Sequence, residues 1–131
     1  QASKIILPGV GAFGRAMEIL RNSSFLPVLE RKVLEEKIPL MGICLGMQLL
    51  FDKSEEGNAV GLGWIKGEIS KFDFDNINQD LHVPHMGWNN ISVAKDSAMT
   101  KSLPKESRFY FVHSYYAKCN ELWRLSHRIR S

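Results

Sequence analysis

The stretch PLMGICLGMQLL, residues 39–50, decides the fold of this chain. It begins with an apolar run bounded upstream by Pro39, which is typical of a buried strand. The residues from Leu45 to Phe51 have instead the pattern of a helix. The chain must turn sharply between the two, so we expect Cys44 to lie on a strand-to-helix turn.

Gly42 and Gly46 flank Cys44 at two residues on each side. This is the spacing of a nucleophile elbow, in which two residues without a Cβ let strand and helix approach while the central side chain points outward. The positive end of the helix favours a thiolate there, and the unpaired N–H of Leu45 would face the oxygen of a carbonyl under attack. The alternative is a cysteine buried for packing, which needs no flanking glycines.

A second glycine-rich turn, PGVGAFG at residues 8–14, follows an apolar strand at residues 4–7. It fits the G-x-G-x-x-G pattern, so a dinucleotide site is one interpretation. That site needs an acidic residue at the end of the next strand, whereas Glu30 falls within residues 26–36, whose apolar positions have helical spacing. A glycine turn beside a nucleophile can also aim backbone N–H groups at an oxyanion, and we favour that use.

The composition is that of one ordinary globular domain, residues 1–131. A net charge of +3, carried by scattered basic residues, argues against nucleic-acid binding. The sequence shows neither an apolar run long enough to span a membrane nor a leader, so we expect a cytoplasmic protein in which Cys44 and Cys119 stay reduced. The start at Gln1 suggests a fragment.

The order strand, glycine turn, helix, strand, elbow, helix predicts an α/β fold with parallel strands, right-handed crossovers and helices on both faces. Both special turns then lie at the carboxyl edge of the sheet, where open α/β folds place their sites. After a polar loop at residues 52–58 we expect a β-rich second half and therefore a mixed, largely parallel sheet. Its short strands are predicted at residues 62–65, 68–72, 83, 88–93 and 109–112, with an exposed connection at 73–78.

Two stretches of the second half combine aromatic and polar residues: VPHMGWN at residues 83–89 and FYFVHSYY at residues 109–116. They can be edge aromatics with hydrogen-bonded polar neighbours, since strands favour aromatic residues. A zinc site made by His82, His85 and His113 is a further alternative. We expect no metal site, because histidines three positions apart on a strand point to opposite faces.

Four motifs resemble those of the class I, or triad, glutamine amidotransferases: PGVGAF (8–13), GICLGMQ (42–48), PHMGWN (84–89) and HSY (113–115). The spacing is most similar to that of the glutaminase subunits of imidazole glycerol phosphate synthase, an enzyme of histidine biosynthesis. The resemblance implies a flavodoxin-like fold and hydrolysis of glutamine to glutamate and ammonia, with no cofactor. It also implies a heterodimer with a (β/α)₈-barrel cyclase subunit that uses the ammonia to make imidazole glycerol phosphate and an aminoimidazole carboxamide ribotide.

The resemblance also implies roles for individual residues. Cys44 would be the nucleophile that forms a glutamyl thioester, and backbone N–H groups of Leu45 and of the turn at Val10 and Gly11 would form the oxyanion hole. Trp88 and Asn89 match the turn that faces the synthase subunit. The residues that match glutamine-binding positions are Gly9, Gln48, His113, Ser114 and Tyr115.

The sequence departs from the family pattern at both ends. The family's first strand and helix are missing, and so is the His-Pro-Glu tripeptide that supplies the general base and its carboxylate; His127 is not followed by Pro-Glu. We therefore expect a fragment, incomplete at both ends, that turns over slowly because the general base, which in its protonated form would protonate the leaving ammonia, is missing.

Two other functions stay open on the sequence. A paralogous amidotransferase would feed ammonia to a different synthase, such as one that makes an amino sugar, and the motifs around Cys44 do not separate these two. A non-catalytic interaction subunit would keep the turn at Trp88 without a working triad.

Overall fold

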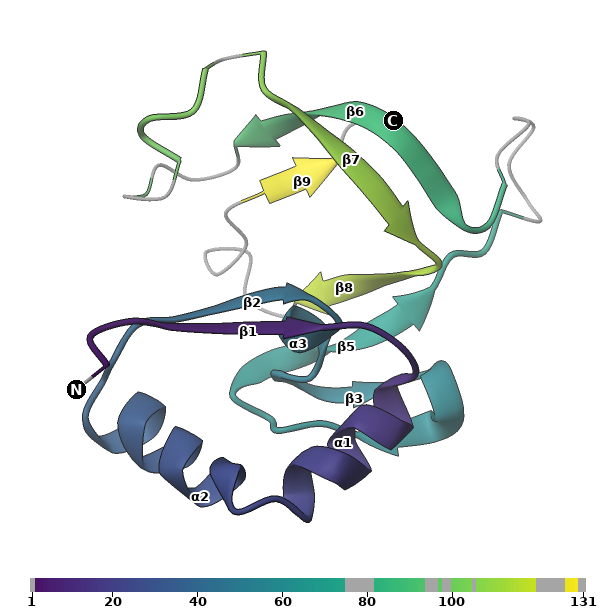
Figure 1. Ribbon diagram of the computed structural model, residues 1–131. Coiled ribbons are helices and arrows are strands. Elements are labelled where there is room, and N and C mark those ends of the chain that lie inside the picture. Colours follow the sequence, from purple (N-terminus) through teal and green to yellow (C-terminus); the bar gives the residue numbers. More distant parts are fainter. Residues whose placement is uncertain are drawn as a thin grey trace.

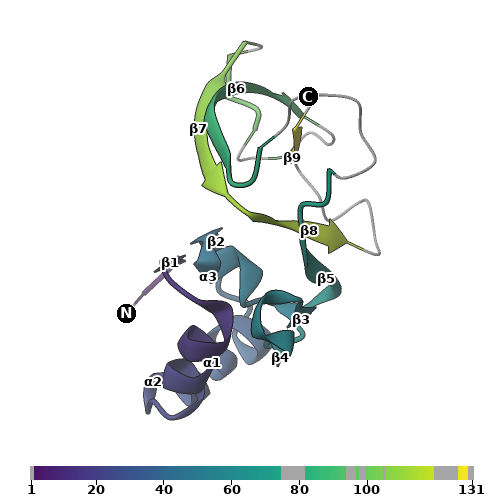
Figure 2. The same cartoon turned by 90° about the vertical axis from the view of Figure 1, so that its right-hand side faces the viewer.

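The computed structural model describes residues 2–74, 82–93, 97, 100–104, 106–119 and, as a backbone strand, 127–129. Residues 2–74 form a helix-containing region, and the described residues that follow are mostly strands that lie above it in Figure 1. Figure 2, turned by 90°, shows the same two regions. Because the described chain contains both helices and strands, and they alternate in its first part, the predicted α/β class is confirmed. No helix of the described part is both long and apolar enough to cross a membrane.

The first strands form the expected βαβ unit. Strand β1 (Ile5–Gly9) pairs in parallel with β2 (Leu40–Cys44), in the register Ile5 to Leu40 and Gly9 to Cys44. The connection runs through α1 (Phe13–Arg21), α2 (Phe25–Glu30) and a π-helical turn, η1 (Arg31–Glu35). The helical spacing predicted over residues 26–36 is thus confirmed.

The helix after Cys44 is shorter than expected. Helix α3 comprises Leu45–Gln48, and Phe51 begins a strand, β3 (Phe51–Ser54), where a helix end and a polar loop were predicted. That prediction was wrong because Phe51 and Ser54 both turn inward and are 2% exposed, so this segment is held in the core although Asp52 and Lys53 between them are polar. The short helix η2 (Glu56–Asn58) and strand β4 (Ala59–Val60) follow.

Two of the predicted short strands are one. Strand β5 (Ile65–Lys71) runs parallel to β3 and replaces the strands expected at residues 62–65 and 68–72. On its other side it pairs antiparallel with β8 (Tyr115–Cys119), a strand that the sequence analysis did not predict.

The remaining strands form a separate antiparallel sheet. Strand β6 (His85–Val93) pairs with β7 (Arg108–His113) and with β9 (His127–Ile129). Val83, expected in a strand, precedes β6. Of the connection predicted at residues 73–78, only 73 and 74 lie among the described residues.

The strands therefore belong to three sheets rather than one: β1-β2, β4-β3-β5-β8 and β7-β6-β9. A hydrophobic core joins α1, α3, β3 and β5. Its buried members are Phe13, Met17, Leu45, Leu49, Phe51 and Ile69.

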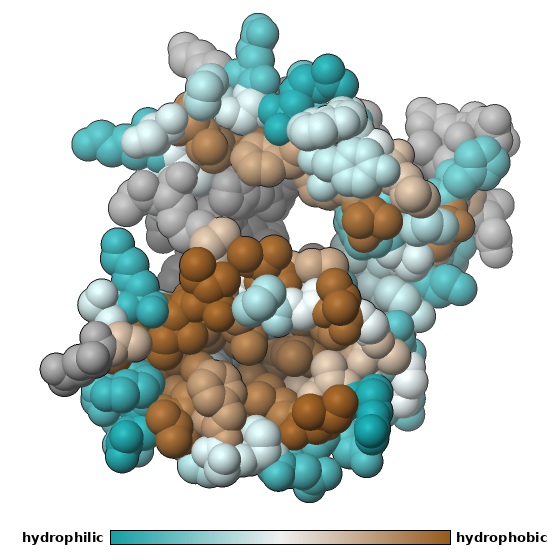
Figure 3. Space-filling model, viewed as in Figure 1, coloured by the Kyte–Doolittle hydropathy of each residue, from teal (hydrophilic) through white to brown (hydrophobic). Residues whose placement is uncertain are grey.

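One face of the β1-β2 sheet is covered by α3, and the other is open within the described part of the chain. The alternate residues Ile6, Met41 and Ile43 on that open face are 62%, 43% and 44% exposed. Figure 3 shows a broad hydrophobic area over this region. The expectation of helices on both faces is therefore not met by these residues.

Candidate functional site

Cys44 ends β2 and immediately precedes α3. Its backbone has φ 52° and ψ −121°, a combination that residues with a side chain rarely adopt, and its side chain is exposed. This is the geometry of a nucleophile elbow. The prediction of a sharp turn at Cys44 is confirmed, and the alternative of a cysteine buried for packing is wrong.

The flanking glycines allow this turn by letting backbones touch. A Cβ on Gly42 would overlap the backbone of Met47, and a Cβ on Gly46 would overlap the carbonyl group of Leu7. Gly9 is also closely packed, although less tightly, since its Cβ would lie 2.9 Å from the Gly46 nitrogen. The end of β1, the end of β2 and the start of α3 are therefore packed backbone to backbone.

The glycine-rich turn lies beside Cys44 because Gly9 is the partner of Cys44 in the β1-β2 register. Neighbouring strands are about 4.8 Å apart, so the turn that follows Gly9 starts next to the thiol. Val10 is 92% exposed, and Gly11 has φ +99°, a conformation that favours glycine. The structure thus brings together the two segments from which oxyanion donors were predicted.

Gln48, expected to bind substrate, lies four residues after Cys44 in α3, which places it one helical turn along the same face. It is a buried polar residue, 8% exposed. The Gln48 side chain is therefore a buried polar group one helical turn beyond the strand-to-helix turn at Cys44.

The predicted residues His113, Ser114 and Tyr115 form the corner where β7 passes into β8. His113 Nδ1 donates to the carbonyl oxygen of Tyr115 at 2.8 Å, and the Phe72 N–H donates to the carbonyl oxygen of Ser114 at 3.0 Å. Tyr115 packs against the core that contains Leu45, so this corner and the elbow share one core.

The His113 ring lies in an aromatic cluster with Phe72 and Phe111, at 5.1 and 5.7 Å between ring centroids. His85, its cross-strand partner, is 5.4 Å away. The described residues contain no group of three or more His, Cys, Asp or Glu side chains that could hold a metal ion.

Trp88 and Asn89, predicted together as partner-facing, lie on opposite faces of β6. Asn89 Nδ2 donates to His85 Nε2 at 3.0 Å, on the face that bears the aromatic cluster. Trp88 is 61% exposed and packs edge-on against its cross-strand partner Tyr110, with 5.7 Å between the ring centroids. Met86 extends this apolar face, which the sequence analysis did not recognise beyond Trp88.

The sequence analysis also missed Glu56. Its carboxylate accepts a hydrogen bond of 2.9 Å from the N–H of Phe13, the first residue of α1. The sequence showed only that a helix begins after the glycine turn, at Phe13. It gave no indication that Glu56, 43 residues further along the chain, would accept a hydrogen bond from this helix start.

Comparison with known proteins decides the family. The sequence matches the family "Glutamine amidotransferase class-I" over residues 2–128. The chain belongs to the class I glutamine amidotransferase family.

Individual relatives of this chain carry the name imidazole glycerol phosphate synthase subunit HisH. The protein of Leptospira interrogans is 48% identical over 91% of this chain and 58% of its own length. That of Sulfurimonas denitrificans is 49% identical over 90% of this chain and 56% of its own length, and that of Bdellovibrio bacteriovorus is 44% identical over 90% and 58%. The chain thus spans less than two thirds of the length of these relatives.

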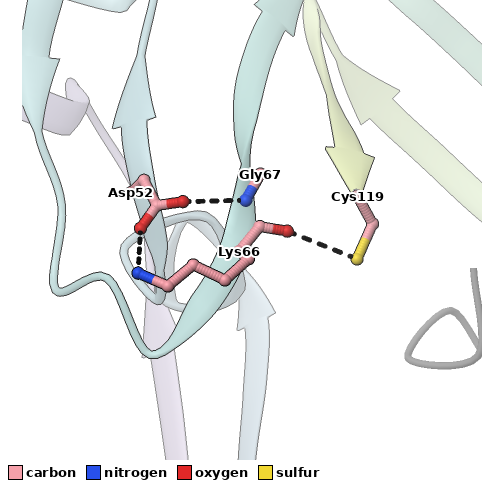
Figure 4. Close-up of polar contacts among 4 residues, drawn as sticks. All are labelled: Asp52, Lys66, Gly67 and Cys119. Atoms are coloured by element: carbon pink, nitrogen blue, oxygen red, sulfur yellow. Dashed lines mark hydrogen bonds and ion pairs between the residues drawn. The ribbon is translucent and has the colours of Figure 1, made fainter. Parts of the chain in front are cut away.

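The chain has a second thiol in a different setting. Cys119, on β8, is half-buried and its Sγ lies 3.7 Å from the carbonyl oxygen of Lys66 (Figure 4). In the same view Asp52 accepts from the Gly67 N–H at 2.9 Å and pairs with Lys66 at 3.0 Å. These contacts join β3, β5 and β8, so Cys119 lies in a structural network and serves as an internal reference for the reactivity of Cys44.

Proposed function

We propose that this amidotransferase is the glutaminase subunit of an imidazole glycerol phosphate synthase. The observation that carries the proposal is the exposed Cys44 on a strained elbow, with the glycine-rich turn alongside in register. The relatives named HisH support the choice of synthase, since they match over about nine tenths of this chain.

The reaction begins when the Cys44 thiolate attacks the side-chain carbonyl carbon of glutamine. The carbonyl π electrons move to oxygen, and the oxyanion accepts hydrogen bonds from the N–H of Leu45, at the open N-terminus of α3, and from the turn at Val10 and Gly11. The oxyanion then collapses, the C–N bond breaks, and ammonia leaves with a proton from a general acid. Water attacks the thioester, releases glutamate and returns the thiol.

The remaining predicted residues would bind the amino-acid part of glutamine. Gly9 contributes backbone at the end of β1, and Gln48 contributes a buried amide one turn beyond the nucleophile. His113, Ser114 and Tyr115 contribute the β7–β8 corner, which is supported by its shared core with the elbow.

The ammonia would pass to a (β/α)₈-barrel cyclase subunit, held as a heterodimer in the cytoplasm. The apolar face at Trp88 and Tyr110 supports a docking role for β6 and β7, because large exposed aromatics mark interaction surfaces. Asn89 lies on the opposite face of β6, where its hydrogen bond to His85 would stabilise the strand that presents Trp88. The cyclase half would make the whole assembly a lyase.

Turnover needs a general acid and base besides Cys44. The 131 residues contain no His-Pro-Glu tripeptide. We therefore expect this chain alone to form the glutamyl thioester, and thus to release ammonia, slowly, and we expect a polypeptide that carries the tripeptide to turn over.

Labelling with the chloromethyl ketone analogue of glutamine tests the proposal. Cys44 displaces chloride to form a thioether, and peptide mass spectrometry locates it. We expect labelling at Cys44 at least about 100-fold faster than at Cys119, in line with the rate contributed by one oxyanion donor, and competition by glutamine. Cys119→Ser is the control that should leave the rate unchanged. Equal labelling of the two thiols would contradict glutaminase chemistry.

The identity of the synthase needs a separate test. Affinity capture with the Cys44→Ala variant from cells of the source organism should recover a cyclase barrel. Capture of an amino-sugar synthase instead would favour a paralogous amidotransferase.

A further inference from the structure

The first N–H of α1 is satisfied from a distant part of the chain. The N-cap residue, Ala12, has no side chain that can accept a hydrogen bond, and helix N-termini leave such N–H groups unpaired. Glu56, on η2, fills this role: its Oε2 accepts from the Phe13 N–H at 2.9 Å. A carboxylate at this end of a nine-residue helix also interacts favourably with the helix dipole.

This hydrogen bond ends the glycine-rich turn. Gly9 anchors the turn on one side by packing against α3, and Phe13, 0% exposed, anchors it on the other. The three residues between them, Val10 to Ala12, are all exposed. Their backbone is therefore held mainly through its two ends, and one of those ends depends on Glu56.

Glu56 is itself held firmly. Its N–H donates to Ser54 Oγ at 3.1 Å, and Ser54 is 2% exposed at the end of β3. The preceding N–H, of Glu55, donates to the carbonyl oxygen of Ile69 at 2.9 Å. The carboxylate thus projects from a corner fixed to the core, which makes it a rigid support rather than a mobile surface charge.

We propose that Glu56 is a positioning residue that sets the Val10–Gly11 turn against Cys44, by holding the N-terminus of α1. The proposal rests on the proposed function, since it assigns Glu56 a part in forming the oxyanion hole. It predicts that the loss of Glu56 impairs reactions that place negative charge in the hole and leaves the thiol itself intact.

Three variants separate the effect of the hydrogen bond to Phe13 from that of losing a nearby carboxylate. Glu56→Ala removes the acceptor, and Glu56→Gln keeps an amide oxygen that can accept from Phe13. Glu55→Ala is the matched control, because Glu55 also accepts from a backbone N–H, that of Lys71 at 2.7 Å, but lies away from the turn.

Three probes are used on each variant of the 131-residue chain. Iodoacetamide reports the thiol alone. The chloromethyl ketone analogue of glutamine reports the thiol together with the oxyanion hole. The third probe is the same ketone without its α-amino group, so it has no positive charge that the Glu56 carboxylate could contact directly.

We expect Glu56→Ala to slow both ketones about 10- to 100-fold at Cys44, because small displacements of a preorganised group have effects of this size. Iodoacetamide should react within about twofold of the wild-type rate, and Glu56→Gln should recover the ketone rates to within about threefold, because a neutral acceptor is roughly half as strong as a charged one. Glu55→Ala should match the wild type with all three probes.

Several outcomes would overturn the inference: unchanged ketone rates in Glu56→Ala, an equal loss with iodoacetamide, or a loss confined to the ketone that has the amino group, which would indicate a direct contact with substrate. These outcomes differ from failure of the proposed function, in which the wild-type chain itself would show no preference of the ketone for Cys44 over Cys119.

Discussion

Gly46 packs directly against the carbonyl oxygen of Leu7, so closely that no Cβ fits between them. This contact packs α3 against β1 and so fixes the strand-to-helix turn on which Cys44 lies. The position of the thiol therefore depends on a residue that has no side chain, two places away.

Gly46→Ala should destabilise the chain and displace the elbow. We expect the free energy of unfolding to fall by about 1–3 kcal/mol, since backbone must move to admit a methyl group in a packed site. Urea denaturation measures it. Gly14→Ala is the control, because a Cβ there would meet only the Ala59 side chain at 3.6 Å, and an alanine in a helix should be neutral or stabilising.

The backbone at Cys44 should store strain that glycine relieves. With φ 52° and ψ −121°, a residue with a Cβ costs about 1–3 kcal/mol relative to a relaxed conformation. We therefore expect Cys44→Gly to unfold at higher urea concentration than Cys44→Ala. A lower midpoint for the glycine variant would mean that the elbow is not strained.

Acid should weaken the β3-β5 junction. The Gly67 N–H and the Lys66 ammonium hold the pKa of Asp52 below its ordinary value of 3.8, and the Lys71 N–H likewise lowers the pKa of Glu55 from 4.5. Both carboxylates therefore contribute stability that is complete above those ordinary values and is lost as the pH falls through the lowered ones.

Asp52→Asn should show a shallower decline of the urea midpoint below pH 4 than the wild type, because it no longer takes up that proton on unfolding. Glu18→Gln is the comparison, since the ion pair of Glu18 with Arg15 is exposed on α1. An identical acid dependence in Asp52→Asn and the wild type would contradict this assignment.

Trp88→Ala should weaken binding of the proposed cyclase subunit without weakening the fold. An aromatic anchor at an interface centre contributes 2 kcal/mol or more, so we expect a Kd increase of about 30-fold or more by calorimetry. The urea midpoint should barely change, because the side chain is 61% exposed. Ile19→Ala, on an exposed position of α1, should leave the affinity unchanged; equal effects of both variants would argue against the Trp88 face.

The open face of β1 and β2 should promote self-association of this chain. Met41→Lys or Ile43→Lys places a charge on that face, and we expect less light scattering at high concentration, because exposed apolar patches drive association. Val60→Lys, which changes an exposed residue on β4 instead, should have a smaller effect.

The elbow and the glycine turn could be predicted because each depends on residues close together in the chain. The strand and turn signals around Cys44 and Gly11 were local, and the positions of both turns were confirmed, whereas the helix after Cys44 is shorter than predicted. β3 was missed because only two of its residues turn inward, and β8 because its aromatic and polar residues gave no alternation.

The sequence alone determined which residues form the strand-to-helix turn, that its cysteine is flanked by glycines, and which family the motifs resemble, since these features rest on backbone preferences over a few residues. The tertiary structure alone decided that Glu56 holds the start of α1, that Trp88 pairs with Tyr110 while Asn89 faces the other way, and that the strands divide among three sheets. Such relationships depend on strand register and on contacts between residues far apart in the chain, and a one-dimensional pattern does not contain them.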